Sequence, residues 1–77
     1  MSYGYSVRLS QLNKEADDTL IGVRLGRLCI ACNRPVSSVA VDLGVTRQTV
    51  YNWFSGSNAP QSQMVSAVEA YLATLTP

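Results

Sequence analysis

Most of the chain repeats its apolar positions every three or four residues, which is the spacing of one buried face of an α-helix. The first such stripe comprises Ile21, Leu25, Leu28 and Cys32. Two Asp and a Thr at positions 17–19 precede it and favour a helix start through capping and negative charge. Pro35 disfavours a helical residue before it, so this helix is expected to end near Asn33. Gly22 and Gly26 leave two interpretations open, a close approach by another element or merely small residues.

The next two helices are predicted by a pair of short apolar stripes that a glycine separates. The earlier one is expected over residues 36–43, with an inward face made of Val36, Val39, Ala40 and Leu43. Gly44 follows it, and glycine readily takes the left-handed conformation found after helix C-termini. Thr46 is a favourable N-cap for the later helix, residues 47–54. That helix is expected to bury Val50, Trp53 and Phe54.

A last helix is predicted after positions 55–60, which are rich in turn-forming residues. Ser62 can cap this helix, and its apolar spacing continues to about Leu75. Its inward residues are expected to be Met64, Val68, Tyr71, Leu72 and Leu75. The pattern as a whole predicts an all-α bundle of four to five short helices.

The first eighteen residues follow a different pattern. Apolar and aromatic residues alternate with small or polar ones at Tyr3, Tyr5, Val7 and Leu9. A period of two is typical of a β-strand, and the same segment of a second copy would supply the strand partner it needs. The alternatives are a loosely ordered arm or a helical turn through Leu9 and Leu12. We therefore expect an N-terminal strand or arm over 1–18, with a role in dimerisation, followed by a helical domain over 19–77.

Composition and charge narrow the class of protein. The chain has 77 residues, enough for one domain, and its 47% apolar content favours a folded domain. The net charge is only +1, but residues 20–56 hold four of the six basic residues and one acidic residue, which makes the middle mildly basic. Arg24 and Arg27, expected to face solvent, interrupt the longest apolar stretch, which is too short to span a bilayer. Without a signal-peptide pattern, a cytoplasmic protein is expected.

The two cysteines do not indicate a metal or redox site. Cys29 and Cys32 are spaced as C-I-A-C, but the chain has no histidine to complete a four-ligand zinc site. They also come late in a helical pattern, whereas redox pairs sit at helix starts. Both are interpreted as small core residues, and no cofactor is expected. Since there is no Gly-rich phosphate loop and no spaced acidic pair, enzymatic activity is not expected either.

The most specific signal is the segment 39–60, which reads VAVDLGVTRQTVYNWFSGSNAP. Two short helices joined by a turn that contains glycine describe a helix-turn-helix. The pattern positions are Val39, Ala40, Leu43, Gly44, Val45, Thr46, Thr49, Val50, Trp53, Gly56 and Pro60. With these residues the segment resembles the helix-turn-helix of the lambda-repressor and Cro-like family. The resemblance implies a DNA-binding domain whose recognition helix spans 47–54.

The exposed face of that helix supplies candidate contacts to DNA. An α-helix fits the major groove, where Arg can bind guanine and Gln can bind adenine through two hydrogen bonds each. The residues expected to contact bases are Arg47, Gln48, Tyr51 and Asn52. Those expected to contact the DNA backbone are Arg34, Thr46, Ser57 and Asn58. Thr46 lies at a helix N-terminus, which favours phosphate, and the resemblance implies the roles of Ser57 and Asn58.

The sequence therefore predicts a sequence-specific, double-stranded DNA-binding transcription regulator. The resemblance implies a Cro-type repressor of a phage or mobile element, a homodimer that occupies an operator palindrome and blocks polymerase. The alternative is a protein-binding module, a phage-type inhibitor or antirepressor, that uses the helix-turn-helix as a scaffold. Weak basicity, the apolar Val36 and the tyrosines Tyr3, Tyr5 and Tyr51 favour the alternative. Phosphate contacts by Arg34, Thr46 and Asn58 would instead indicate DNA.

Overall fold

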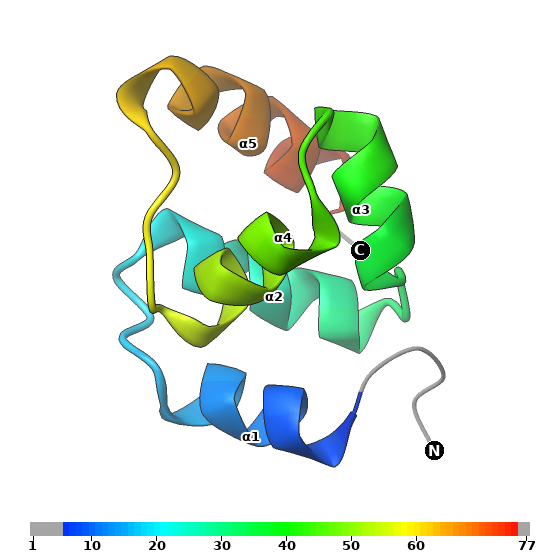
Figure 1. Cartoon of the computed structure of the whole chain (residues 1–77), viewed down its shortest axis with the longest axis vertical. Coiled ribbons are helices and arrows are strands. Elements are labelled where there is room, and N and C mark those ends of the chain that lie inside the picture. The colour runs from blue at the N-terminus through cyan, green and yellow to red at the C-terminus, as the bar shows by residue number, and fades with distance from the viewer. Residues whose placement is uncertain (1–5, 76–77) are drawn as a thin grey trace.

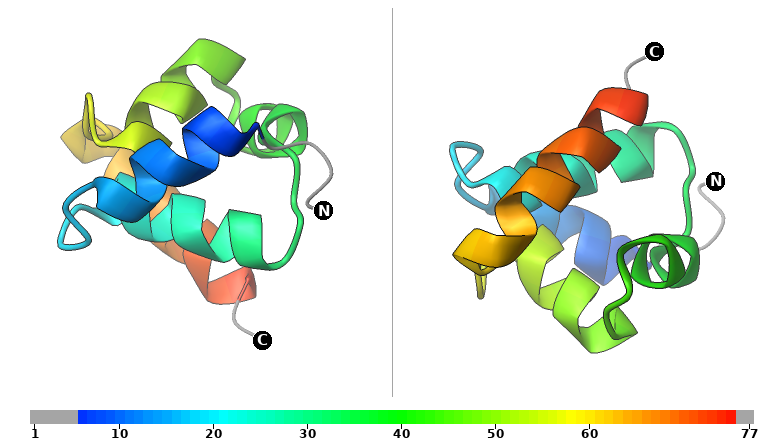
Figure 2. Two further views of the ribbon diagram at one scale, coloured as in Figure 1. Left: turned by 90° about the horizontal axis from the view of Figure 1, so that it is seen from below. Right: turned by 90° about the horizontal axis from the view of Figure 1, so that it is seen from above.

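The computed structural model describes residues 6–75, which form five α-helices and no strand. The helices are α1 (Val7–Glu15), α2 (Ile21–Ala31), α3 (Val36–Leu43), α4 (Arg47–Ser55) and α5 (Ser62–Thr74). α2 packs against α1, α4 and α5, and α4 also contacts α1 and α3 (Figure 1). Seen from below and from above, α2 lies between α1 and α5 (Figure 2). The all-α bundle predicted from the apolar spacing is confirmed.

The N-terminal segment is helical from Val7 onward, so the strand predicted through Val7 and Leu9 is wrong. Ser6 caps α1, because its hydroxyl accepts a hydrogen bond from the Leu9 N–H at 3.1 Å. Leu9 and Asn13 lie one helical turn apart and are both buried, while Gln11 between them is exposed; a strand would place all three side chains on one face. The alternative of a helical turn through Leu9 and Leu12 is confirmed. The other residues of the alternation, Tyr3 and Tyr5, lie outside the described residues.

The two glycines of α2 allow α4 to approach its backbone closely. A Cβ added at Gly22 would lie 2.8 Å from the Cβ of Trp53. A Cβ added at Gly26 would lie 2.5 Å from Nδ2 of Asn13 and 2.8 Å from Cγ of Phe54. Of the two interpretations of this pair, the close approach is therefore confirmed. Because Gly22 and Gly26 have no side chains, α4 can pack directly against the backbone of α2.

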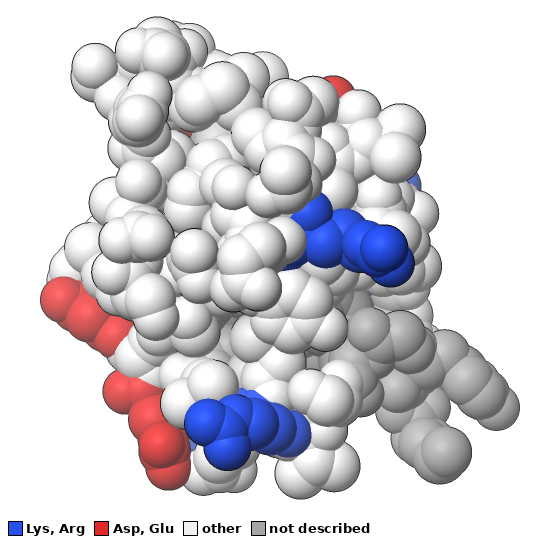
Figure 3. Space-filling view, viewed as in Figure 1, with Lys and Arg blue, Asp and Glu red and all other residues white. Residues whose placement is uncertain are grey.

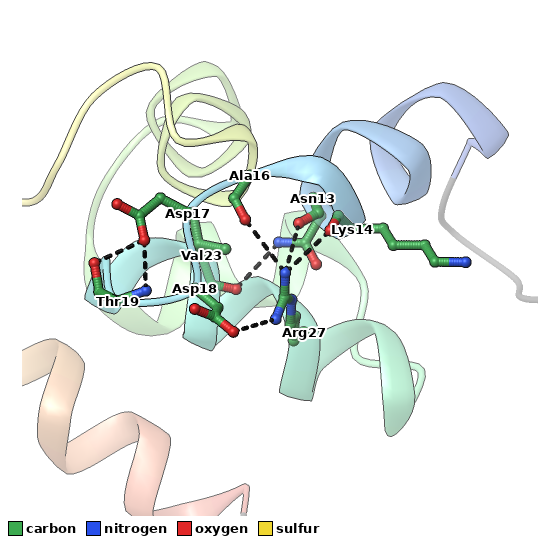
Figure 4. Close-up of polar contacts among 8 residues, drawn as sticks. All are labelled: Asn13, Lys14, Ala16, Asp17, Asp18, Thr19, Val23 and Arg27. Carbon is green, nitrogen blue, oxygen red and sulfur yellow. Dashed lines mark hydrogen bonds and ion pairs between the residues drawn. The ribbon is translucent and has the colours of Figure 1, made fainter.

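The acidic segment before α2 does not cap the helix as expected. The helix begins at Ile21, and its N-cap residue, Leu20, makes no side-chain capping bond. Oδ1 of Asp17 instead accepts hydrogen bonds from the Thr19 N–H at 2.9 Å and the Thr19 hydroxyl at 2.7 Å (Figure 4). The backbone and hydroxyl bonds from Thr19 lower the pKa of Asp17. Asp17 thus closes a local turn between α1 and α2, an alternative that Asp offers a backbone outside helices.

Arg27 is half-buried rather than solvent-facing, whereas Arg24 is exposed as expected. Nη2 of Arg27 lies 3.1 to 3.4 Å from three carbonyl oxygens at the end of α1, those of Asn13, Lys14 and Ala16 (Figure 4). Nη1 pairs with a carboxylate oxygen of Asp18 at 3.3 Å. Helix C-termini leave carbonyls without helical partners, and a cation there is favourable. Arg27 therefore ties α2 to the end of α1.

The two cysteines occupy different environments, so the core prediction is wrong for Cys32. Cys29 is buried and Cys32 is exposed. α2 ends at Ala31, and Cys32 is its C-cap. Cys32 therefore no longer follows the helical spacing that placed it on the buried face. Val23, which lay outside the predicted stripe, is fully buried. Burial, with a smaller effect of the neighbouring Cys32 thiol, raises the pKa of the Cys29 thiol to about 12.

α3, a three-residue turn and α4 form a helix-turn-helix, and its local signals act as predicted. Gly44 has φ of +69° in the left-handed region, and the Val45 N–H donates to the Ala40 carbonyl at 3.0 Å. Thr46 caps α4, its hydroxyl accepting a hydrogen bond from the Thr49 N–H at 3.1 Å. The shared core includes Leu9, Leu25, Cys29, Val36, Val39, Ala40, Val50, Trp53, Phe54, Val68 and Leu75. α4 is thus fixed by the turn before it and by packing of its buried face against the core.

The last helix begins one residue earlier than the predicted cap at Ser62 implies. Gln61 is the N-cap of α5 and makes no side-chain capping bond, so Ser62 is the first helical residue. Val68 and Leu75 are buried as expected, and the remaining predicted inward residues, Met64, Tyr71 and Leu72, are partly buried against the core. No helix among residues 6–75 has the length and apolar character needed to cross a membrane.

Candidate nucleic-acid interface

α4 divides into a buried face and an exposed polar face. Val50, Trp53 and Phe54 point into the core, with at most 4% of each exposed. Arg47 and Gln48 are exposed, and Tyr51 keeps 37% of its surface accessible. This division follows from the helical repeat, because residues three and four apart share a face. Three of the four predicted base-contact residues thus share the exposed side of the helix.

The same residues line a shallow cleft between α4 and the start of α3. The cleft has a volume of about 300 Å³ and is lined by Pro35, Val36, Ser37, Arg47, Gln48 and Tyr51. α3 therefore places its first turn beside the exposed face of α4. Figure 3 shows the side of the molecule on which α4 lies in front; its basic side chains form two separate patches, and acidic side chains gather at its lower left edge. The charge available to an anionic partner on this side is modest.

Asn52, the fourth predicted base-contact residue, is less exposed and is engaged within the helix. Its side-chain oxygen accepts a hydrogen bond from Nε2 of Gln48 at 3.1 Å. Its backbone carbonyl accepts hydrogen bonds from the Asn58 N–H at 3.2 Å and the Ser55 hydroxyl at 3.4 Å. Asn52 therefore connects the exposed face of α4 to the loop that follows the helix.

The residues predicted to contact the DNA backbone fall into separate groups. Thr46 is exposed next to Arg47, and its hydroxyl also lies 2.8 Å from that of Thr49. Ser57 is exposed beyond α4, with its hydroxyl 3.0 Å from that of Ser55. Asn58 is exposed in the same loop. Thr46 thus stands before α4, while Ser57 and Asn58 stand after it, so that the two groups bracket the helix in the chain.

Asn58 opens onto a second, larger cleft that the sequence did not indicate. Its volume is about 520 Å³, and it is lined by Val45, Thr49, Trp53, Asn58, Ala59, Gln61, Gln63 and Met64. The cleft lies between α4, the loop after it and the start of α5. Gln61 and Gln63 are the polar residues that sequence reasoning missed; their place beside the predicted start of the last helix was the available signal.

The partners seen for the Arg34 side chain lie on α3 and α5. Its guanidinium carbon lies 5.9 Å from the ring centroid of Tyr71 on α5, and Nη1 lies 3.9 Å from Oδ2 of Asp42 on α3. The Tyr71 hydroxyl donates to the same carboxylate oxygen at 2.7 Å. Burial and this hydrogen bond to Asp42 raise the pKa of Tyr71 to about 12. Arg34 thus belongs to a contact between the α2–α3 loop, α3 and α5.

Comparisons of the chain with protein-family models, curated proteins and solved structures found no match. The resemblance of residues 39–60 to the lambda-repressor and Cro-like family therefore stays a prediction from the sequence. Within the described residues, no group of three His, Cys, Asp or Glu side chains is placed to hold a metal ion. The features that bear on function are thus the helix-turn-helix and the exposed face of α4.

Proposed function

We propose that this protein is a sequence-specific, double-stranded DNA-binding transcription regulator that reads the major groove with α4. The observation that carries the proposal is the division of α4, whose core side is fully packed while Arg47, Gln48 and Tyr51 remain exposed. These side-chain types suit base recognition, since Arg pairs with guanine, Gln with adenine, and an aromatic ring can pack on a thymine methyl. A helix-turn-helix offers such a helix to DNA by its N-terminal residues, where Arg47 and Gln48 stand.

The remaining parts of the proposal concern how the protein holds the DNA backbone. Thr46, at the start of α4, and Ser57 and Asn58, after it, would contact sugars and phosphates. Arg34 already has Asp42 and Tyr71 as partners, so it is the weakest of the predicted backbone contacts. Contacts at both ends of α4 would fix the register of the helix in the groove.

In this proposal the protein acts as a homodimer on a palindromic operator in the cytoplasm of a bacterial or phage-infected cell. A two-fold symmetric dimer reads two half-sites, and helix-turn-helix dimers place them roughly 34–36 Å apart, one turn of DNA. Occupying an operator would then block polymerase, the action of a Cro-type repressor. With a net charge of +1, binding to random DNA should be weak.

One observation favours a second function, a protein-binding module. The side of the molecule that presents α4 carries few basic side chains (Figure 3). In addition, Val41 on α3 is 80% exposed. Proteins that bind DNA by charge concentrate Lys and Arg on the binding face. A protein partner would instead use the apolar and aromatic groups exposed near the helix-turn-helix.

Selection from a random double-stranded DNA pool separates the two functions. The DNA-binding proposal predicts a recovered palindrome, and a variant with both Arg47→Ala and Gln48→Ala should lose about 2–6 kcal/mol of affinity per half-site, because each bidentate pair contributes roughly 1–3. If no sequence is enriched and only weak, salt-sensitive binding remains, the DNA proposal is refuted and the protein-binding alternative takes its place.

A further inference from the structure

The exposed face of α4 contains one side-chain hydrogen bond that bears on base recognition. Nε2 of Gln48 donates to Oδ1 of Asn52 at 3.1 Å, between residues four apart on the same helix. Pairs at this spacing meet because they lie one above the other on the helical surface. Gln48 is exposed, so this bond gives its side chain a defined orientation that a free surface glutamine lacks.

Asn52 is itself fixed by the loop that follows α4. Its backbone carbonyl accepts hydrogen bonds from the Asn58 N–H and the Ser55 hydroxyl, and its side chain is only partly exposed. Its neighbour in sequence, Trp53, is 4% exposed in the core. A residue anchored by its own backbone and by its neighbour is a suitable partner for orienting a longer, freer side chain.

The bond leaves Gln48 with the groups that adenine requires. A glutamine amide has two N–H donors and one carbonyl oxygen. Asn52 takes up one N–H, and the other N–H and the oxygen remain to pair with N7 and N6 of adenine in the major groove. With Oδ1 of Asn52 facing Gln48, a Gln48 amide turned by half a rotation would bring two acceptor oxygens together, an unfavourable contact. In this orientation Asn52 therefore favours the Gln48 amide orientation that leaves the Gln48 oxygen available to adenine.

We propose that Asn52 is a positioning residue for base recognition, which holds Gln48 ready to read adenine and does not itself contact a base. This inference rests on the proposed function and revises the role of Asn52 within it. Ordering Gln48 before binding lowers the entropy lost on binding DNA, which favours the matching base over the others. The adenine position of each half-site is then set by two residues, one that touches the base and one that does not.

The first test needs no DNA and measures the mobility of side-chain amides by NMR relaxation. Gln63, exposed on α5, is an internal reference for a surface glutamine. The Gln48 amide should be more ordered than the Gln63 amide in the wild type, and Asn52→Ala should remove the difference. Asn52→Asp, which keeps an oxygen acceptor at this place, should retain it. Equal mobility of Gln48 and Gln63 in the wild type would overturn the inference.

The second test measures base preference by competition between operator variants. In Asn52→Ala, the preference for adenine at the position read by Gln48 should fall about twofold per half-site, the change expected from an exposed pair four residues apart. The guanine preference attributed to Arg47 should stay unchanged, and Asn52→Asp should rescue the adenine preference even if its charge lowers overall affinity. If Asn52→Ala binds the selected operator tightly and its adenine preference is unchanged, the inference is overturned while the proposed function stands. If no operator is selected, the proposed function fails together with the assignment of adenine.

Discussion

Nδ2 of Asn13 lies 2.7 Å from the backbone carbonyl oxygen of Phe54, and this hydrogen bond joins α1 to the end of α4. The same amide nitrogen donates to the Val23 carbonyl on α2 at 3.1 Å, so one side chain links three helices. Asn13 is 2% exposed, which makes it the one buried polar residue among the described core positions. The position of α4 in the bundle thus depends on the side-chain amide of Asn13 as well as on apolar packing.

Replacing Asn13 is expected to destabilise the fold. Asn13→Ala removes both of these buried hydrogen bonds, and since each contributes roughly 0.5–1.5 kcal/mol, a loss of about 1–3 kcal/mol is expected. Urea unfolding followed by circular dichroism measures the loss in the free energy of unfolding. Gln11→Ala is the matched control, since Gln11 is exposed on the same helix and its side chain donates a hydrogen bond to Glu15 within that helix. An unfolding free energy equal for Asn13→Ala and the wild type would show that the bond contributes nothing net.

Replacing Gly26 by alanine is expected to destabilise the fold, although replacing a helical glycine usually stabilises a protein. At a free helical site Gly→Ala stabilises by about 1 kcal/mol, because alanine has the higher helix propensity. Here the new Cβ would meet Nδ2 of Asn13 and the ring of Phe54, and overpacking of this kind costs about 1–3 kcal/mol. Thermal unfolding should therefore show a lower Tm for Gly26→Ala. Ser66→Ala, on the exposed side of α5, should leave Tm unchanged or raise it slightly. A higher Tm for Gly26→Ala would contradict the close approach of α4.

Local signals explain why the helix-turn-helix could be predicted, whereas for α1 a helical turn was only one of several alternatives. Gly44 and Thr46 determine the ends of α3 and α4 through their own backbone and hydroxyl, so their effect is readable in the sequence. The segment before residue 10 carried a period of two over too few positions to outweigh a helix cap and the burial of Leu9. Asn13 shows no pattern at all, because its two bonds join residues 10 and 41 positions away.

The candidate site divides in the same way. The exposure of Arg47, Gln48 and Tyr51 follows from the 3.6-residue repeat once the buried stripe of α4 is known. The side chain of Arg34 takes partners on α3 and α5, a choice that only the packing of the helices determines. The bonds of Asn52 were similarly hidden, since a helical Asn reads as a surface residue in sequence. The roles of all eight predicted residues toward DNA stay predictions.

The two cysteines are expected to differ in reactivity toward an alkylating reagent. Cys32 is exposed, whereas Cys29 is buried with its pKa raised to about 12, and only the thiolate is nucleophilic. Mass spectrometry of the native protein at neutral pH should therefore show rapid modification of Cys32 alone. In denaturant both should react. Equal rates in the native state would mean that α2 opens readily around Cys29.

Stability is expected to fall at alkaline pH through Tyr71. Its pKa is raised from 10.0 to about 12 in the folded state, so the neutral hydroxyl is favoured by folding. Its contribution is complete below pH 10 and is lost as the pH rises toward 12. Unfolding curves across this window should be less pH-dependent in Tyr71→Phe, and least so when Cys29, whose pKa is also raised, is replaced as well. Tyr51→Phe, which removes a tyrosine on the exposed face of α4, is the control and should retain the wild-type loss.

Comparing Arg47→Ala with Arg24→Ala distinguishes base recognition by α4 from a general attraction of positive charge to DNA. Arg47 stands on the exposed face of α4, while Arg24 is exposed beside α5, where it lines a shallow cleft with Glu69 and Leu72. Arg47→Ala should weaken binding to a selected operator by about 1–3 kcal/mol per half-site, and Arg24→Ala, which removes the same charge, by less than about 0.5. Arg47→Lys keeps the charge but not the two-pronged hydrogen bonding, so it should recover little of the specificity. Equal losses for Arg47→Ala and Arg24→Ala in an electrophoretic titration would show that charge alone draws the protein to DNA.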